Sequence, residues 1–304
     1  MSEARQGIMA MVVACLTWGL VPLFYKQLEH IPPIEILAHR TLWSAVIFVG
    51  VLMFQGRLKL LGEALLSRRT VVVIAFAAFL ISFNWYFFIW SVANDKATEA
   101  SLGYFLFPLV AVLLGRVVFR EQLQRLQWIS IGIALFAVVL LTAGLGVAPW
   151  IALALSTTFG LYGLIKKGLS IGPVVSVTAE VIVLVPIAAV ILWFAHGDGQ
   201  GAFGADVKDS LLLVLSGALT ATPLILFSFA TKRVALSTVG LVQYLNPTLQ
   251  FFCAVVIFGE PFGVWHGIAF PLIWIALALY SFAALRQEKA ASKVDSSVAR
   301  SSTT

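Results

Sequence analysis

The chain reads Thr17-Trp-Gly-Leu-Val-Pro-Leu-Phe-Tyr-Lys-Gln-Leu28 near its start, and the later stretch Thr158-Phe-Gly-Leu-Tyr-Gly-Leu-Ile-Lys-Lys-Gly-Leu169 matches it, with six identities in twelve positions. A second alignment has nearly the same offset. It pairs Leu102, Leu106, Pro108, Val117, Phe119 and Glu121 with Leu241, Leu245, Pro247, Val256, Phe258 and Glu260. Because two separate alignments agree in this way, the sequence predicts an internal repeat of about 140 residues.

The composition indicates a membrane protein. Of the 304 residues, 61% are apolar and 11% are charged, against roughly 25% charged residues in a typical soluble domain. Such a chain has too few charges to cover a soluble surface and too many apolar residues to be disordered. The two cysteines, Cys15 and Cys253, lie inside apolar runs, without the spacing of metal ligands or of a disulfide framework.

The apolar residues form continuous runs of about the length that a helix needs to cross a bilayer, not the short alternating segments of a barrel. We predict ten membrane-spanning helices, at 7–24, 34–54, 70–93, 97–116, 123–144, 147–166, 172–195, 210–231, 234–258 and 262–284. The first run lacks a small-residue cleavage site, so we expect a retained span and not a removed signal peptide.

The positive charges predict the topology. With a cytoplasmic N-terminus, sixteen of the twenty Lys and Arg residues fall in cytoplasmic segments. Lys26, Lys96 and Lys208 fall outside, and Arg40 lies within a span. This bias predicts that both termini are cytoplasmic. The +6 net charge then reflects topology, and we expect no nucleic-acid partner.

The repeat divides the chain into a first unit at 1–145, a second unit at 146–285 and a Ser-rich tail at 286–304, which we expect to be disordered. Five spans per unit is an odd number, so the second unit must enter the membrane from the opposite side. Inverted repeats of this kind build secondary transporters, with the substrate site near the midplane. The alternative is a duplication that only enlarges a helix bundle.

Several local motifs resemble a known family. They are Trp18-Gly19, Pro22 and Tyr25-Lys26; His39-Arg40-Thr-Leu-Trp43-Ser44; Asn84-Trp85-Tyr86 with Ile89-Trp90; Glu99-Ala-Ser-Leu-Gly-Tyr104; and Leu241-Val-Gln243-Tyr244-Leu-Asn246-Pro247-Thr-Leu-Gln250-Phe, followed by Phe258-Gly-Glu260-Pro261. Over residues 5–285 the chain resembles the EamA family of the drug/metabolite transporter superfamily, and within it the RarD-like (chloramphenicol-sensitive protein) group. One departure is Phe107, where the family often has Asn before the proline of span four.

The resemblance implies an all-α fold of ten spans in two inverted five-helix repeats, and a small-molecule permease of the bacterial cytoplasmic membrane. It also implies a cavity lined by spans one, three, four, six, eight and nine. We therefore expect a small-molecule substrate and contacts with membrane lipids, in a monomer or homodimer. We expect no cofactor and no metal ion. The four histidines His30, His39, His196 and His266 are scattered along the sequence, which argues against an enzyme that gathers such residues at one interface.

Polar groups deep in the spans are the candidate substrate-binding residues, because they are costly in a bilayer. The full set is Trp18, His39, Arg40, Asn84, Trp85, Tyr86, Tyr104, Gln243, Tyr244 and Asn246. Helix–helix hydrogen bonding and packing are the structural alternative. Pro247 should free the carbonyl of Gln243, and both Pro108 and Pro247 could act simply as kinks or gates.

Three ionisable groups have alternative roles. Arg40 needs a carboxylate, carbonyls or an anionic ligand within the membrane, and Glu99 is a possible partner. Glu180 is the only acid well inside a span and is a weak candidate for proton coupling, because burial disfavours a charged carboxylate; it could equally pair with Lys166 or Lys167. His39 could also take part in proton coupling or be a structural hydrogen-bonding group.

The sequence therefore predicts a secondary transporter, not an enzyme, that moves small organic solutes such as amino acids, metabolites or amphiphilic drugs by alternating access. The aromatic and amide residues favour neutral or zwitterionic solutes. No Walker motif is present to support ATP-driven transport. An integral membrane enzyme acting on lipids, or a channel, is the alternative.

Overall fold

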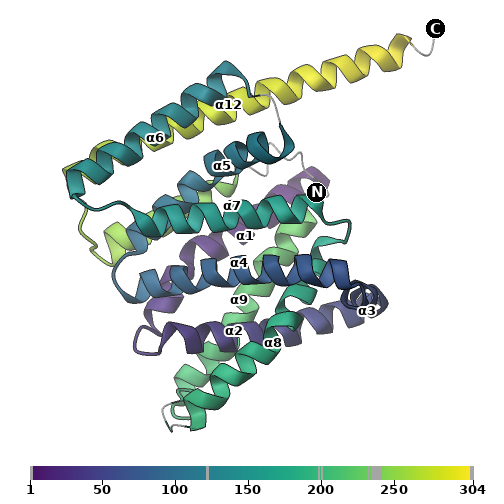
Figure 1. Ribbon diagram of the computed structural model, residues 1–304, viewed down its shortest axis with the longest axis vertical. Helices are drawn as coiled ribbons and strands as arrows, with labels where there is room; N and C mark the ends of the chain where they lie inside the picture. Colours follow the sequence, from purple (N-terminus) through teal and green to yellow (C-terminus); the bar gives the residue numbers. More distant parts are fainter. Residues whose placement is uncertain are drawn as a thin grey trace.

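The computed structural model describes residues 3–120, 123–197, 199, 201–231, 233 and 242–301. In this part of the chain the regular elements are helices, apart from one isolated bridge between Phe203 and Asp206. In chain order (Figure 1) they are α1 (Glu3–Lys26), α2 (Pro33–Phe54), α3 (Leu58–Leu66), α4 (Arg68–Ala93), α5 (Ala97–Phe119), α6 (Arg125–Leu145), α7 (Trp150–Gly168), α8 (Pro173–Gly197), α9 (Val207–Thr231), α11 (Leu245–Phe252), the π-helical turn η1 (Cys253–Ile257) and α12 (Val264–Ser301). The predicted all-helical class is confirmed.

Eight of the described helices are long and apolar enough to cross a membrane. The predicted sixth and ninth spans coincide with two shorter apolar helices, Trp150–Lys166 and Leu245–Ile257. Residues 234–241 of the predicted ninth span lie outside the described residues, as does Glu121. Ten spans and two cytoplasmic termini therefore stay predictions.

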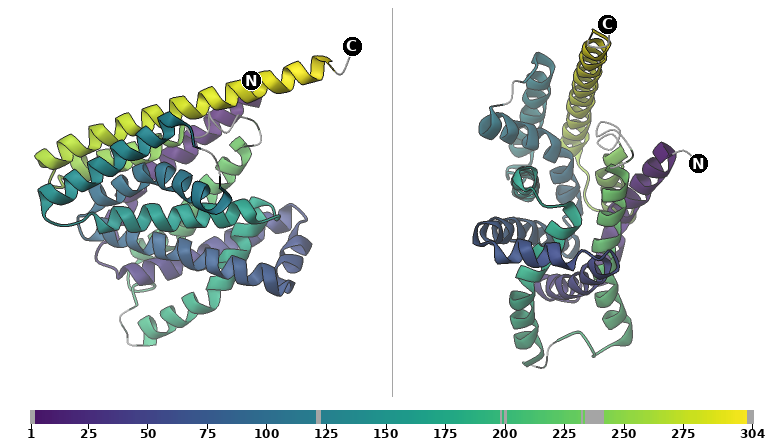
Figure 2. Two further views of the ribbon diagram at one scale, coloured as in Figure 1. Left: turned by 45° about the horizontal axis from the view of Figure 1, so that its top comes forward. Right: turned by 90° about the vertical axis from the view of Figure 1, so that its right-hand side faces the viewer.

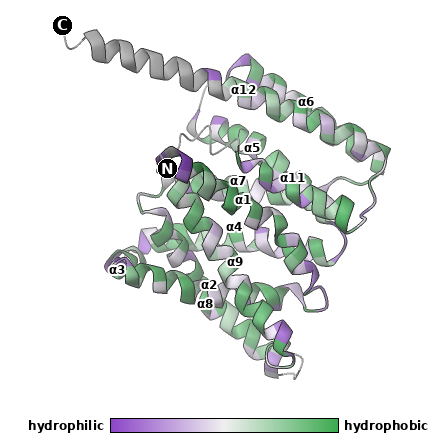
Figure 3. Cartoon of the chain, turned by 180° about the vertical axis from the view of Figure 1, so that it is seen from behind, coloured by the Kyte–Doolittle hydropathy of each residue, from purple (hydrophilic) through white to green (hydrophobic). Residues whose placement is uncertain are grey.

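Apolar residues predominate along the helices (Figure 3). Many large apolar side chains are exposed on the bundle, as a protein surrounded by lipid requires. The side chain of Phe54 is 92% exposed and that of Trp193 is 78% exposed. In water such exposure would be unfavourable, whereas lipid tails solvate these groups. The buried residues instead include many polar and small side chains.

Two elements differ from the sequence-based expectation. Helix α3 lies in the connection between α2 and α4, where we predicted no helix; Leu61 and Ala64 on one of its faces pack with Ile74 of α4 and Val175 of α8. The segment from residue 286, predicted to be disordered, continues α12 to Ser301 and projects beyond the bundle (Figure 2). It contains no Gly or Pro up to that point and is rich in helix-forming Ala, Lys, Arg and Glu.

Helices from the two predicted units pack against each other throughout the bundle. Helix α1 packs on α9 and α11, while α7 packs on α4 and α5; α2 contacts α8, and α6 lies along α12 (Figures 1 and 2). The first unit is therefore not a separate domain with its own core. Its polar residues meet those of the second unit inside one bundle.

Candidate substrate site

Arg40 of α2 is a buried cation held by groups from two other helices. Its side chain is buried, its Nε donates a hydrogen bond of 2.5 Å to Oγ1 of Thr220 in α9, and its guanidinium carbon lies 4.0 Å from the ring centroid of Trp85 in α4. Among the described residues, no carboxylate lies within ion-pair distance of Arg40. Glu99, one of the partners left open by the sequence, does not pair with Arg40 here, and a hydroxyl and an aromatic face contact it instead.

Two tyrosines from further helices complete this group. The phenols of Tyr25 in α1 and Tyr104 in α5 lie within electrostatic reach of Arg40. The structure thus brings Arg40, Trp85 and Tyr104 together, as the hypothesis of a shared site requires. Tyr86 instead makes an edge-on contact with Phe87, with ring centroids 5.3 Å apart.

The side-chain amide of Asn84 in α4 forms hydrogen bonds with two other helices. Its Nδ2 donates to the carbonyl oxygen of Leu155 at 2.8 Å and to Oγ1 of Thr158 at 3.0 Å, both in α7. Its Oδ1 accepts a hydrogen bond of 2.9 Å from the hydroxyl of Tyr104. The structural alternative raised from the sequence, helix–helix hydrogen bonding, therefore describes Asn84 in this conformation.

A second polar group lies where α11 crosses α1. The Oδ1 of Asn246 accepts a hydrogen bond of 2.9 Å from Nε2 of Gln250, which also donates to the carbonyl oxygen of Trp18 at 3.3 Å. Gln250 is buried, and its Oε1 has no partner among the described atoms. Trp18 and Tyr25 are two helical turns apart on one face of α1, so this face connects the second group with the Arg40 group.

The start of α11 modifies the predicted roles of the prolines. A turn at Tyr244 precedes α11, so Pro247 lies in the first helical turn, where its missing N–H leaves no hydrogen bond unmade. Gln243 is half-buried just before this turn, and the ring of Tyr244 packs in the apolar cluster that includes α12. Pro108, by contrast, lies inside the continuous helix α5.

Glu180 is the centre of a hydrogen-bonded network between α7 and α8. Nζ of Lys166 lies 2.6 Å from its Oε1, the Ser176 hydroxyl donates to Oε1 at 3.0 Å, and the Tyr162 hydroxyl donates to Oε2 at 2.9 Å. Lys166 also donates to the Ser176 hydroxyl. The pairing with Lys166 that we left open is therefore present.

The sequence indicates that Glu260, the repeat equivalent of Glu121, anchors a turn at a helix end, but it does not predict that Glu260 caps α5. Its Oε1 accepts from the backbone N–H of Ala97 and its Oε2 from that of Thr98, both at 2.7 Å, and the side chain is buried. These N–H groups open α5, whose own N-cap residue, Lys96, supplies no side-chain cap. A carboxylate from the second unit thus caps a helix of the first and interacts favourably with its dipole. The signal available in the sequence was the repeat-equivalent pair Glu121 and Glu260.

The same end of the bundle carries two further contacts between the units. Nε2 of His30 lies 2.7 Å from Oδ2 of Asp209, and Oε1 of Glu35 accepts a 2.7 Å hydrogen bond from the backbone N–H of Ala202. Together with Glu260 they form what we term the Glu260 end, which the predicted topology places outside the cell. Polar contacts between the two units therefore close this end.

Two of the four histidines, which are scattered along the sequence, lie together in the structure. His39 of α2 and His196 of α8 have ring centroids 6.2 Å apart, beside Glu35. They meet because α2 packs along α8, which a linear sequence without contact information does not reveal. His30 and His266 are not part of this group.

A cavity of about 70 Å³ lies between α5, α6 and α12, where its lining includes Leu102, Leu141 and His266. Arg40 and Asn84 are not among its lining residues. The cavity therefore does not reach the Arg40 group, and the Arg40 side chain is buried.

The fold and its buried polar groups define a multi-pass α-helical membrane protein. Residues 5–143 match the EamA-like transporter family. The chain is 42% identical to Protein RarD of Streptomyces exfoliatus, over 94% of this chain and 91% of that protein. It is 38% identical to the Uncharacterized transporter YojE of Bacillus subtilis, over 95% of this chain and 98% of that protein.

A solved crystal structure is similar in fold, with a TM-score of 0.61 and 16% identity, over 91% of this chain and 97% of that one. The chain belongs to the EamA-like transporter family of the drug/metabolite transporter superfamily. Within that family it belongs to the RarD group, and it is a multi-pass protein of the bacterial inner membrane.

Proposed function

We propose that the chain is a secondary transporter in which two inverted five-helix units expose a solute site alternately to either side of the membrane. One observation carries this proposal. A β-carbon added to Gly19 would lie 2.6 Å from Cβ of Leu249, and one added to Gly160 would lie 3.3 Å from Cγ1 of Val110. The two alignments pair Gly19 with Gly160 and Val110 with Leu249, so exchange of the units turns the first contact into the second.

The pattern of helix packing supports the same exchange. If α1, α2, α4, α5 and α6 correspond to α7, α8, α9, α11 and α12, the contact of α1 with α11 corresponds to that of α7 with α5. The contact of α1 with α9 likewise corresponds to that of α7 with α4, and α2–α8 and α6–α12 correspond to themselves. Such an arrangement has two states of similar free energy, related by exchange of the units, as alternating access requires.

The polar contacts favour a conformation that is closed at the Glu260 end. There, Glu260, Glu35 and His30 each contact the other unit. The ion pair between Lys166 and Glu180 connects two helices of the second unit and does not link it to the first. Under the predicted topology the protein is closed to the outside in this conformation.

The Arg40 group favours solutes that carry a carboxylate and an apolar part. Arg40 offers several N–H donors but has no acidic partner among the described residues, so a carboxylate could form the strong paired hydrogen bonds that guanidinium groups favour. Trp85 and Tyr25 supply aromatic surface beside it. Amino acids and related zwitterionic metabolites combine both features.

Flux measurements in proteoliposomes test this function. Uptake of labelled amino acids should saturate with concentration and be accelerated by unlabelled solute inside the vesicles. Arg40→Lys should lower uptake at least about tenfold, because an ammonium cannot reproduce the planar fork over Trp85, whereas exposed Lys208→Arg should leave it unchanged. Flux that neither saturates nor responds to internal solute would indicate a channel, and conversion of a lipid without flux would indicate an enzyme.

A further inference from the structure

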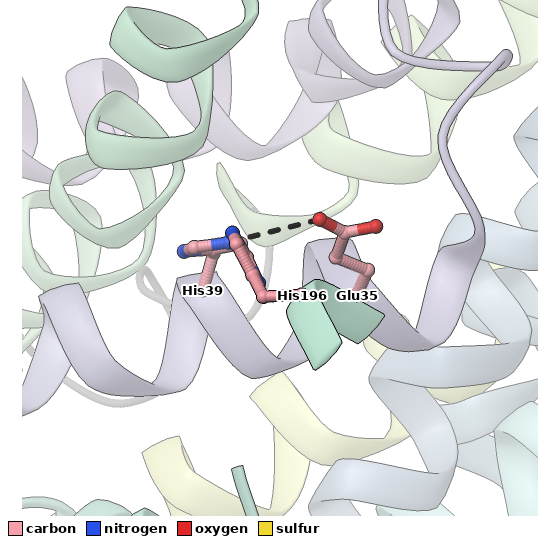
Figure 4. A group of neighbouring side chains, drawn as sticks. All are labelled: Glu35, His39 and His196. Atoms are coloured by element: carbon pink, nitrogen blue, oxygen red, sulfur yellow. Dashed lines mark ion pairs between the residues drawn. The ribbon is translucent and has the colours of Figure 1, made fainter. Parts of the chain in front are cut away.

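Three potential metal ligands converge at the Glu260 end of the bundle (Figure 4). Glu35 and His39 are four residues apart on α2 and therefore lie on one helix face, while His196 comes from the last turn of α8. Nε2 of His39 lies 3.9 Å from Oε1 of Glu35. One ligand atom from each residue lies within 4.8 Å of the other two.

His39 and Glu35 are buried and incompletely paired. His39 is 5% exposed, and its Nε2 has no hydrogen-bond partner among the described atoms. Glu35 is 2% exposed; its Oε1 accepts from the N–H of Ala202, and no Lys or Arg lies within ion-pair distance of it in the described part of the chain. A buried carboxylate beside an unpartnered imidazole nitrogen is costly unless a cation lies between them.

The surroundings of His196 orient it as metal-binding histidines are commonly oriented. Its Nδ1 lies 3.0 Å from the carbonyl oxygen of Leu192, so a proton on Nδ1 would be donated there and leave the lone pair of Nε2 free. Nε2 now lies 3.2 Å from the carbonyl oxygen of Phe203. A neutral imidazole cannot donate from both nitrogens, so coordination of a cation by Nε2 would resolve this conflict.

We propose that Glu35, His39 and His196 bind a divalent transition-metal ion of the Zn²⁺ class. Two imidazoles and one carboxylate are a ligand set that Zn²⁺ favours, with a solvent molecule as fourth ligand. Tetrahedral coordination at the usual bond lengths separates ligand atoms by roughly 3.4 Å, so the observed spacing needs a contraction of about 1.4 Å at most. His196 is exposed and can supply this movement by rotating its side chain.

The bound ion would join the two units. Glu35 and His39 belong to the first unit and His196 to the second, and the site lies at the end that Glu260 also closes. Metal binding itself does not depend on the proposed transport function. If that function holds, the ion stabilises the conformation closed at this end and inhibits flux.

Binding is measured on protein in lipid nanodiscs, with the affinity tag removed because polyhistidine tags also bind Zn²⁺. Titration with ZnCl₂ against a chromophoric zinc indicator should give one site per chain. His196→Ala should weaken binding at least about tenfold, as should Glu35→Gln. The matched control His266→Ala, whose ring packs on Phe262 and Phe270 of its own unit outside the group, should bind as the unaltered protein does.

Melting temperatures measured in EDTA show whether each variant is folded. Because His196 is exposed, His196→Ala should disturb the fold least. Zn²⁺ should raise the melting temperature of the unaltered protein and of His266→Ala, but not that of His196→Ala. Absence of saturable binding across the micromolar range, or binding that His196→Ala leaves unchanged, overturns the site. Loss of transport in metal-free protein would count against the proposed inhibition alone, because the binding titration is independent of flux.

Discussion

Replacing Glu260 with glutamine tests whether the cap on α5 favours the conformation closed at the Glu260 end. The two carboxylate oxygens accept from the N–H groups of Ala97 and Thr98, each at 2.7 Å. A glutamine side chain keeps one carbonyl oxygen but turns an NH₂ group toward the other N–H. One charge-assisted hydrogen bond, worth about 1.5–3 kcal/mol, is lost, together with the favourable interaction with the helix dipole.

This contact joins the two units, so the proposed transport cycle predicts that it breaks when the Glu260 end opens. A loss of about 2–3 kcal/mol that falls on the closed conformation alone would shift the equilibrium toward the open one by about 30- to 150-fold. The shift becomes small if the cap also persists in the open conformation. The size of the population change therefore separates a gate contact from a purely structural cap.

Double electron–electron resonance, which measures the distance between two spin labels, reports the population of the open conformation. Spin labels at Glu29→Cys in the first unit and Lys208→Cys in the second are exposed at the Glu260 end, and the buried Cys15 and Cys253 are replaced by alanine. Glu260→Gln should add a population at longer distance. An unchanged distance distribution with a lowered melting temperature would refute the gating role, and exposed Glu63→Gln is the control.

Three further substitutions test other contacts. Asn84→Ala should lower the free energy of unfolding by about 2–3 kcal/mol, since it removes the joint between α4, α5 and α7; an unchanged melting temperature would contradict this. Gly19→Ala should cost about 1–3 kcal/mol by thermal denaturation, because its β-carbon would meet Leu249 at 2.6 Å, whereas the control Gly163→Ala meets nothing within 4 Å and should cost nothing. If Glu180 couples transport to protons, Glu180→Gln should abolish the dependence of uptake on a pH gradient, and an unchanged dependence would exclude that role.

The sequence predicted the helices well because membrane spans follow from the length and continuity of apolar runs. Its failures concern elements that such runs do not describe. Helix α3 was not predicted because the charged residues between Arg57 and Arg69 are typical of a connection between spans. Its short apolar face is explained by its packing against α8, which the sequence does not show. The predicted boundaries at Phe54, Ala93 and Ala97 coincide with helix ends, because polar residues adjoin the apolar runs there.

The candidate site was predictable in its residue types but not in its partners. Arg40, Trp85 and Tyr104 were chosen as rare polar or amphipathic groups in apolar runs, and the structure brings them together. Gln250 and Glu260 were not chosen, although both bond to backbone atoms of the other unit. Their significance depends on which helix ends meet, and a single sequence contains no direct record of that.

The two units differ in their charges at repeat-equivalent positions near the Arg40 group, as the alignment of the repeats indicates. The repeat pairs Tyr25 with Lys166 and, after a shift of one position, Arg40 with Glu180. In the second unit the equivalent positions form an ion pair, so each charge is already balanced. In the first unit the cation faces a phenol and is left without an acid among the described residues.

Under the proposed function, an anionic group of a solute would be attracted to the first unit, and the charges of the second unit would already balance each other. Exchange of the units would move the barrier from one end of the bundle to the other without moving Arg40 from α2. The solute would then stay with the same cation while access changes, so that a duplicated scaffold would have symmetric conformations and a single binding site.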